Sequence, residues 1–343
     1  MMTKILLSHS PVNRANFYGD RALKELQQMG EVVLNPHDEV LSLEQLAELA
    51  QGCQIIVSSR EAPAPAALFE QLPELLAVCR VAVDIRSIDV EAASRHGVLV
   101  TRATPGFDTS VSEWIIGVMI DLSRGITRAA AAFWQGQSPE ALMGRELRGS
   151  VLGIVGYGCI GRKLAAVANA LGMRVLVNDP HVDVGDVNIK QVSFEQLLSA
   201  SDYVACLAPA LAQTHNLFNA RAFATMQPHA FFINAARGEL VDEEALLAAL
   251  NNAQIAGCGL DVGLTSVQMP SPQLAAHPRV IATPHVGGLT PPASEHQAMD
   301  TVRQVRAILA GVMPEGAVNP ACASRAVAAF GLQALPEKAL NND

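Results

Sequence analysis

The sequence predicts an α/β protein made of two Rossmann-like domains, each with a doubly wound parallel sheet. Three observations predict this fold. Short apolar runs alternate with helical stretches along most of the chain, and the runs are continuous, as in strands buried on both faces. A second series of such runs begins at residue 151 and contains a G-x-G-x-x-G turn. The length of 343 residues corresponds to about two domains.

The composition narrows the class of protein. Hydrophobic residues make up 50% of the chain but aromatic residues only 4%, so the cores should be aliphatic. The formal net charge is -9, and Lys and Arg do not cluster, which makes nucleic acid and membranes poor partners. The six cysteines contain no C-x-x-C pair, no signal peptide is evident, and no apolar run approaches the ~18 residues that cross a bilayer. We therefore expect reduced thiols and a cytoplasmic protein.

The first hundred residues carry the first series of apolar runs. These runs contain few polar residues, which predicts a small parallel sheet covered by helices on both faces. Gly52 is placed to end the helical run before it. The predicted strands are 4–9, 54–60, 75–83 and 97–103, and the predicted helix is 43–52.

Residues 108–136 form the longest helical run of the chain. Ser110 and Glu113 have capping-box spacing, which predicts that one long helix begins there. The run is apolar over too much of its surface to face water alone. Two interpretations stay open, namely a helix buried between the domains and a subunit interface.

From residue 151 strands and helices alternate regularly, which predicts right-handed βαβ units and a doubly wound sheet. Two prolines open the last helix, where no backbone donor is missed. The tail 321–343 shows no clear periodicity, so it is either a loose end or an arm packed on a neighbour. The predicted strands are 151–155, 174–179, 202–208, 230–236, 256–262 and 280–284, and the predicted helices are 159–172, 194–201, 242–250 and 291–311.

The glycine-rich turn predicts a dinucleotide site. Gly156 allows the tight turn, Gly158 lets the backbone approach a pyrophosphate, and Gly161 lets the helix touch the strand. The helix N-terminus adds amide donors and partial positive charge. Asp179 follows Gly161 by 18 residues, close to the ~20 expected of an acceptor for a ribose hydroxyl. Because this carboxylate would repel a 2′-phosphate, we expect NAD rather than NADP as the cofactor.

Arg237 is the first candidate for substrate chemistry. It follows the predicted strand 230–236, at the end where doubly wound folds bind ligands. Its planar guanidinium can grip a carboxylate and polarise the neighbouring carbonyl of a 2-keto acid. Asp242 is expected to cap the next helix.

Five segments then show a resemblance to a known family. They are "IDVEAASRHGVLVTRA", "ELRGSVLGIVGYGCIGRKLA", "INAARGELVDEEAL", "AGCGLDV" and "TPHVGGLT", and they occur in family order. The chain resembles the D-isomer-specific 2-hydroxyacid dehydrogenases, which include phosphoglycerate, glyoxylate/hydroxypyruvate and D-lactate dehydrogenases.

The resemblance implies a fold and a set of roles. A nucleotide domain (104–288) would be inserted into a substrate domain (1–103 and 289–320), with 321–343 as a tail, and a homodimer would form on the helix after Ser110. Arg237 would bind and polarise the substrate, Asp261 would lie near the nicotinamide amide, and His285 would be the acid/base. The residues expected to bind the cofactor are Gly156, Tyr157, Gly158, Cys159, Ile160, Gly161, Asp179, Ala208, Pro209, Thr214, Ala235, Ala236, Arg237, Asp261, His285 and Gly287.

The sequence departs from the family pattern near His285. The family usually has a glutamate five residues after the aspartate of "LDV", and here that position is Ser266. A neighbouring carboxylate favours the charged form of an imidazole, so His285 should titrate near an unperturbed histidine. We expect reduction to decline as the pH rises above that point, while oxidation persists. Formate dehydrogenases in the family also lack this carboxylate, but Ser266 is not the amide expected there.

A second departure concerns the loop 81–87, "VAVDIRS", where the family commonly has "GVGVD". The amides of Ala82 and Val83 remain available for a substrate carboxylate. Arg86 and Arg60 could bind a second acidic group, although exposed loop arginines are the simpler interpretation. The histidines have no metal-like spacing, so we expect no metal site.

The sequence therefore predicts an NAD-dependent oxidoreductase that interconverts a small 2-keto acid and its D-2-hydroxy acid. The alternative is an NAD(H)-sensing regulatory protein on the same fold with little turnover. Ser266 favours the alternative, whereas the presence of both Arg237 and His285 favours the enzyme.

Overall fold

The computed structural model describes residues 2–265 and 268–333. The chain divides into two compact units, which we call unit 1 (Met1–Gly106 and Pro291–Asp343) and unit 2 (Phe107–Thr290). Each unit is a parallel sheet with helices on both faces, so the predicted α/β class is confirmed. No described helix combines the length and the apolar character that a membrane crossing needs.

The sheet of unit 1 has five parallel strands in the order β2-β1-β3-β4-β5. Every residue of β3 and β4 is buried, because helices cover both faces. The register pairs Ile5 with Ile55, and Ser58 with Arg80, which brings the ends of β3 and β4 together. The strands are β1 (Lys4–Leu7), β2 (Glu31–Leu34), β3 (Ile55–Ser58), β4 (Ala77–Arg80) and β5 (Leu99–Arg102).

Two hydrophobic cores lie on the two faces of this sheet. One core joins the sheet to α2 (Gly19–Gln27), α13 (Pro291–Leu309) and α14 (Ser324–Phe330). The helix α1 (Pro11–Phe17) packs against α2 and α13. The other core joins the sheet to α3 (Leu43–Leu49), α4 (Ala66–Gln71) and α5 (Val90–Arg95). Segments from the start and the end of the chain therefore build one unit.

The described part of the tail corrects both predictions for it. A short η3 (Pro320–Cys322) leads into α14, and Ala323 and Ala326 are fully buried in the core of unit 1. The guanidinium of Arg325 also donates to the carbonyl of Pro73 at 3.0 Å. Residues 321–333 thus pack on their own unit rather than forming a loose end or an arm on a neighbour, and residues 334–343 of the predicted tail lie outside the described residues. The small alanines that make this contact have no periodic pattern that the sequence could reveal.

The sheet of unit 2 has seven parallel strands in the order β12-β11-β10-β9-β6-β7-β8. The order reverses next to β6, as in a doubly wound sheet, where such a switch point is the usual ligand site. The strands are β6 (Val151–Val155), β7 (Arg174–Asn178), β8 (Ile189–Gln191), β9 (Tyr203–Cys206), β10 (Phe231–Asn234), β11 (Gly257–Leu260) and β12 (Val280–Ala282).

Helices again cover both faces of this sheet. One core packs α6 (Asp108–Arg124) and α8 (Cys159–Ala170) against it, and the other packs α9 (Phe194–Ala200), α10 (Ala220–Thr225) and α11 (Glu243–Asn251). Asp242 accepts a hydrogen bond from the amide of Ala245, which confirms that it caps α11. The remaining short helices are α12 (Pro272–Ala275), η1 (Ala212–Thr214) and η2 (Gly238–Leu240).

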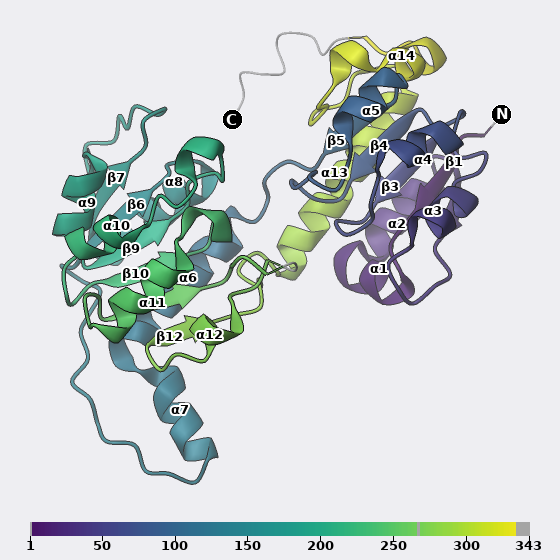
Figure 1. Cartoon of the computed structure of the whole chain (residues 1–343). Helices are drawn as coiled ribbons and strands as arrows, with labels where there is room; N and C mark the ends of the chain where they lie inside the picture. The colour runs from purple at the N-terminus through teal and green to yellow at the C-terminus, as the bar shows by residue number, and fades with distance from the viewer. Residues whose placement is uncertain (1, 266–267, 334–343) are drawn as a thin grey trace. The chain divides into compact units, whose positions relative to one another are not determined.

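The predicted long helix is two helices, and its predicted cap is wrong. α6 begins at Asp108 without a side-chain cap, and the hydroxyl of Ser110 instead bonds that of Thr290 at 2.7 Å. Gly125 has a φ of 64°, a left-handed conformation that ends α6 before α7 (Ile126–Trp134) begins. Figure 1 shows α7 extending from the body of unit 2, with the following chain returning along an extended path.

Candidate active site

All of the residues expected to bind the cofactor lie along the carboxyl edge of the sheet in unit 2. Parallel strands end at the same edge, so segments far apart in sequence become neighbours there. Along the strand order, this edge carries His285 and Gly287 after β12, Asp261 after β11, Ala235, Ala236 and Arg237 after β10, Ala208, Pro209 and Thr214 after β9, Gly156, Tyr157, Gly158, Cys159, Ile160 and Gly161 after β6, and Asp179 after β7.

The turn after β6 has no room for a side chain at two of its glycines, but it has open space at the third. Gly156 has a φ of 100°, and a Cβ built on it would lie 2.7 Å from the amide nitrogen of Ala208. A Cβ on Gly161 would lie 2.4 Å from the carbonyl oxygen of Gly156. A Cβ on Gly158 would have no atom within 4 Å. Space at Gly158, directly before the 12-residue helix α8, suits a pyrophosphate on the helix N-terminus.

Asp179 is half-buried beside this turn. Its Oδ2 accepts a hydrogen bond from the amide of Tyr157 at 2.8 Å, and its Oδ1 accepts one from the amide of His181 at 2.9 Å. Each carboxylate oxygen can accept a second hydrogen bond, so the pair can still receive the hydroxyls of a ribose. The residues present therefore fit a dinucleotide with a free 2′-hydroxyl.

The turn after β10 holds the backbone of Arg237. The fully buried Asn234 accepts from the amide of Ala236 at 3.0 Å and donates from Nδ2 to the carbonyl of Arg237 at 2.8 Å. A Cβ on Gly238 would lie 2.3 Å from the backbone of Gly263, so the next turn is tightly packed as well. Sequence reasoning identified Arg237 but missed Asn234, because an asparagine at a strand end carries no signal without its partners.

The turn after β12 places His285 in an uncommon backbone conformation. His285 has a φ of 57°, in the left-handed region that few residues other than glycine adopt. Asp261 is only 3% exposed and accepts from Thr283 Oγ1 at 2.6 Å, from the amide of Val286 at 2.8 Å and from the amide of Gly287 at 2.7 Å. The carboxylate of Asp261 thus binds the turn on both sides of His285. Backbone strain of this kind is concentrated at functional sites.

This arrangement adds a role for Asp261. The resemblance implies that Asp261 lies near the nicotinamide amide, whereas here both of its oxygens bind the turn that presents His285. Ser266, which stands where the family has its glutamate, lies outside the described residues.

The candidate substrate residues of unit 1 lie at the carboxyl edge of its own sheet. Arg60 follows β3, and Ala82, Val83 and Arg86 follow β4. Ala82 is 5% exposed, and its carbonyl accepts from the amide of Ala103 at 3.0 Å. The guanidinium of Arg86 forms an ion pair with Asp84 at 2.9 Å. Arg86 is therefore held in place within the loop.

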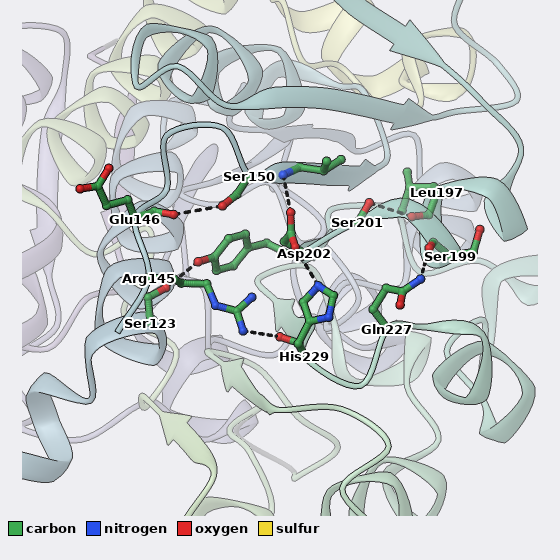
Figure 2. A network of polar contacts seen from close by, with 12 residues as sticks. Ser123, Arg145, Glu146, Ser150, Leu197, Ser199, Ser201, Asp202, Gln227 and His229 are labelled. Atoms are coloured by element: carbon green, nitrogen blue, oxygen red, sulfur yellow. Dashed lines mark hydrogen bonds and ion pairs between the residues drawn. The ribbon is translucent and has the colours of Figure 1, made fainter. Parts of the chain in front are cut away.

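A further polar network in unit 2 occupies the opposite edge of the sheet. Asp202, just before β9, accepts from the amide of Val151 at 2.7 Å and bonds His229 Nε2 at 2.8 Å. Figure 2 shows Asp202 facing the ring of His229. Arg145 donates to the carbonyl of His229 at 3.0 Å. These contacts tie the chain that returns from α7 to the amino ends of the strands. The network lies away from the ligand edge and supports the fold. No group of three or more possible metal ligands occurs among the residues described.

Comparison with known proteins settles the family. The family description "D-isomer specific 2-hydroxyacid dehydrogenase, NAD binding domain" matches residues 116–287. The chain is 36% identical to the (S)-sulfolactate dehydrogenase of Chromohalobacter salexigens over 247 residues, covering 71% of this chain and 80% of that protein. The chain belongs to the D-isomer-specific 2-hydroxyacid dehydrogenase family. It therefore carries the NAD-binding domain of a family of oxidoreductases.

Other members of the family extend the comparison. The chain is 33% identical to the D-3-phosphoglycerate dehydrogenase of Haemophilus influenzae, covering 86% of this chain and 74% of that protein. It is 34% identical to that of Synechocystis sp., covering 72% of this chain but only 45% of that longer protein.

Solved structures agree with the fold. D-lactate dehydrogenase of Escherichia coli has a TM-score of 0.80 at 23% identity, covering 92% of this chain and 100% of that one. A glyoxylate reductase from Paecilomyes thermophila has a TM-score of 0.77 at 24% identity, covering 89% and 95%.

Proposed function

We propose that this protein interconverts a small 2-keto acid and its D-2-hydroxy acid with NAD(H) as cofactor. The observation that carries the proposal is the turn of His285, held in a left-handed conformation by three hydrogen bonds to the buried Asp261. Such a turn is costly to maintain for a histidine with no function. Arg237 and the glycine turn lie on the same sheet edge as His285. Unit 2 therefore carries a guanidinium for the substrate carboxylate, an acid and a binding site for the dinucleotide.

Each residue has a defined part in reduction. NADH, when bound, supplies the hydride that reaches the carbonyl carbon. The guanidinium of Arg237 binds the substrate carboxylate and polarises the adjacent carbonyl. His285, as imidazolium, stabilises the negative charge that grows on the carbonyl oxygen and donates the proton that completes the hydroxyl group. In oxidation the neutral imidazole of His285 takes that proton back. The names of the relatives, from lactate dehydrogenase to phosphoglycerate dehydrogenase, agree with a 2-keto acid or 2-hydroxy acid as the substrate.

The test is the oxidation of NADH with a panel of 2-keto acids that includes glyoxylate, pyruvate, hydroxypyruvate and phosphohydroxypyruvate. We expect turnover with at least one compound, and formation of the D-isomer of its hydroxy acid. Tight NADH binding without turnover of any compound would contradict the proposal and favour the regulatory alternative.

We also propose a homodimer formed through α6, α7 and the chain that follows them. α7 has no buried residue, and Phe133 and Trp134 are 64% and 83% exposed. Leu142 and Met143 are exposed nearby in sequence, and so large a set of exposed apolar residues is typical of an interface. A second copy of the same helices would cover them symmetrically. Sedimentation of the wild type and of Trp134→Ser tests this, since a dimeric wild type and a weaker variant dimer are expected.

A further inference from the structure

We propose that Gln191 is a positioning residue for the selection of the cofactor. It holds the loop 179–184, which follows β7, in the conformation that presents the carboxylate of Asp179 to the ribose of NAD. The inference rests on the proposed function, because it takes NAD as the cofactor and Asp179 as the acceptor for its ribose. Gln191 acts through Asp179 and not on the cofactor itself.

The strand β8 brings Gln191 next to this loop. β8 is the edge strand of the sheet, and its register with β7 sets Gln191 opposite Val177, two residues before Asp179. The two strands are parallel, so Gln191 ends β8 at the carboxyl edge where Asp179 follows β7. Asn178 supports this pairing, since its Nδ2 donates to the carbonyl of Val192 at 3.0 Å. A residue 12 positions along the chain from Asp179 therefore lies beside its loop.

The side-chain amide of Gln191 makes three hydrogen bonds with the loop. Its Nε2 donates to the carbonyl of Asp179 and to the carbonyl of Val182, both at 2.9 Å. Its Oε1 accepts from the amide of Val184 at 3.2 Å. A glutamine side chain has two N–H donors, so both of them are used. One amide group thus connects three backbone groups of the loop.

The loop has no helix or strand of its own. Among the residues that the structure describes, the carbonyls of Asp179 and Val182 and the amide of Val184 have no backbone partner. The side chains of Val182 and Val184 are half-buried and pack against the core that contains residues of α8. The two valines therefore hold the loop by apolar contacts, and Gln191 satisfies its backbone polar groups.

One of these hydrogen bonds restrains Asp179 directly. Gln191 holds its carbonyl, while its carboxylate accepts from the amides of Tyr157 and His181 at 2.8 and 2.9 Å. The side-chain rotamers that a residue can adopt depend on its backbone dihedrals. A hydrogen bond to the carbonyl of Asp179 therefore also restrains the direction of its carboxylate.

A restrained carboxylate distinguishes the two cofactors. Asp179 can accept hydrogen bonds from the ribose of NAD, whereas it repels the 2′-phosphate of NADP. In a loop that is no longer held, the carboxylate can move away from an incoming phosphate. Such a loop must also be ordered when NAD binds, which costs conformational entropy. Loss of the Gln191 amide should therefore weaken NADH binding and narrow the preference for NADH over NADPH.

Calorimetric titration of Gln191→Met with NADH and with NADPH tests the proposal. Methionine has a similar length but lacks the amide group, and the position is exposed, so the variant should fold normally. We expect the Kd for NADH to rise by about three- to tenfold, as for the loss of neutral hydrogen bonds. The ratio of the Kd for NADPH to the Kd for NADH should fall several-fold. Gln254→Met, at an exposed glutamine elsewhere in unit 2, is the control and should bind both cofactors as the wild type does.

The same substitution in an Asp179→Ala background separates positioning from a general effect on the fold. If Gln191 acts through Asp179, Gln191→Met should leave the Kd ratio of Asp179→Ala unchanged, because no carboxylate remains to be positioned. A purely structural role would instead weaken the binding of both cofactors equally, and would do so in both backgrounds.

Three results would overturn the proposal: a wild type without a preference for NADH, an unchanged Kd ratio in Gln191→Met, and an equal fall of the ratio in both backgrounds. None of these measurements requires turnover. A failure of every 2-keto acid as a substrate would therefore contradict the proposed function and leave the test of Gln191 valid.

Discussion

In unit 1 the carboxyl edge of the sheet is filled by polar side chains, whereas in unit 2 the same edge is lined by glycine turns. The buried polar residues of the first edge are Ser8, His9, Ser10, Asn35, Ser58, Ser59 and Arg80. Ser8, Asn35 and Arg80 bond the backbone of neighbouring loops. The hydroxyl of Ser8, for example, accepts from the amide of Ser59 at 2.9 Å. The second edge instead turns tightly at Gly156 and leaves open space at Gly158 for a ligand.

The difference shows how one architecture serves two purposes. An edge filled by polar side chains uses them to hold the backbone of neighbouring loops. An edge built on glycine presents backbone donors directly, and depends on a few side chains, such as Asp261 and His285, for its chemistry. Substitutions at the two edges should therefore fail in different ways.

The largest effect should come from His285, the acid/base of the glycine-lined edge. Its replacement in His285→Ala removes proton transfer, so kcat should fall by about 10²- to 10⁴-fold. Steady-state NADH oxidation measures the change, with His277→Ala, a half-buried histidine elsewhere in unit 2, as the control. A loss below tenfold would show that another group donates the proton.

Arg237→Lys tests whether substrate binding in unit 2 requires the planar guanidinium group or only a positive charge. Lysine retains the charge but cannot make two parallel hydrogen bonds to a carboxylate, so kcat/KM should fall about a hundredfold, equivalent to ~3 kcal/mol. Arg221→Lys, at the exposed start of α10, is the control. A lysine variant with near-normal kcat/KM would remove Arg237 from the substrate site.

The stability of unit 1 should instead be sensitive to acid, because His9 is buried at the carboxyl edge of its sheet. Burial, with a contribution from Arg80, lowers the pKa of His9 from 6.5 to about 3, and its Nδ1 has no partner among the described residues. At a pH between these two pKa values, His9 is protonated in the unfolded chain and neutral in the folded chain. The free energy of unfolding should therefore fall as the pH falls through this window, by about 1.4 kcal/mol per pH unit.

Urea unfolding at pH 7 and pH 5 measures this change in the free energy of unfolding. The wild type should lose about 2 kcal/mol more than His9→Phe between these values, because phenylalanine retains the ring beside Tyr18 without the titrating group. His37→Gln, an exposed position, should lose as much as the wild type. Equal losses in the wild type and in His9→Phe would mean that other groups cause the acid sensitivity.

Two glycines of the second edge separate ligand binding from folding. Gly158→Ala places a Cβ in open space, so the protein should fold normally but bind NADH about tenfold more weakly, since the pyrophosphate would lose its close approach. Gly161→Ala places a Cβ 2.4 Å from a carbonyl oxygen and should lower the unfolding temperature. Calorimetric titration with NADH and thermal unfolding measure both variants. An unchanged NADH affinity in Gly158→Ala would place the pyrophosphate elsewhere.

The smallest effect should come from Asp179. Asp179→Ala removes a ribose acceptor and a phosphate-repelling charge together, so the preference for NAD over NADP should narrow by several-fold to about tenfold. The ratio of kcat/KM for the two cofactors reports it. If the ratio does not change, the specificity lies in other residues of this edge.

Much of the fold could be predicted from the sequence, because strands and helices depend on local patterns. Continuous apolar runs marked the strands of both sheets, and the glycine spacing marked the turn after β6. The strands β2 and β8, each at an edge of its sheet, were not predicted. Both are only partly buried and contain a charged residue, Glu31 or Lys190, so their apolar runs are short. The helix break at Gly125 was missed because a single glycine also occurs inside helices.

The sequence by itself determined the alternation of strands and helices, the family, and the candidates Arg237, His285 and Asp179. Only the tertiary structure showed that Asp261 grips the His285 turn, that Asn234 holds the turn of Arg237, and that Arg80 braces the loops of Arg60 and Arg86. The physical reason is distance along the chain. Asp261 and Gly287 are 26 residues apart, and their contact depends on the order in which β11 and β12 join the sheet, which no local pattern specifies.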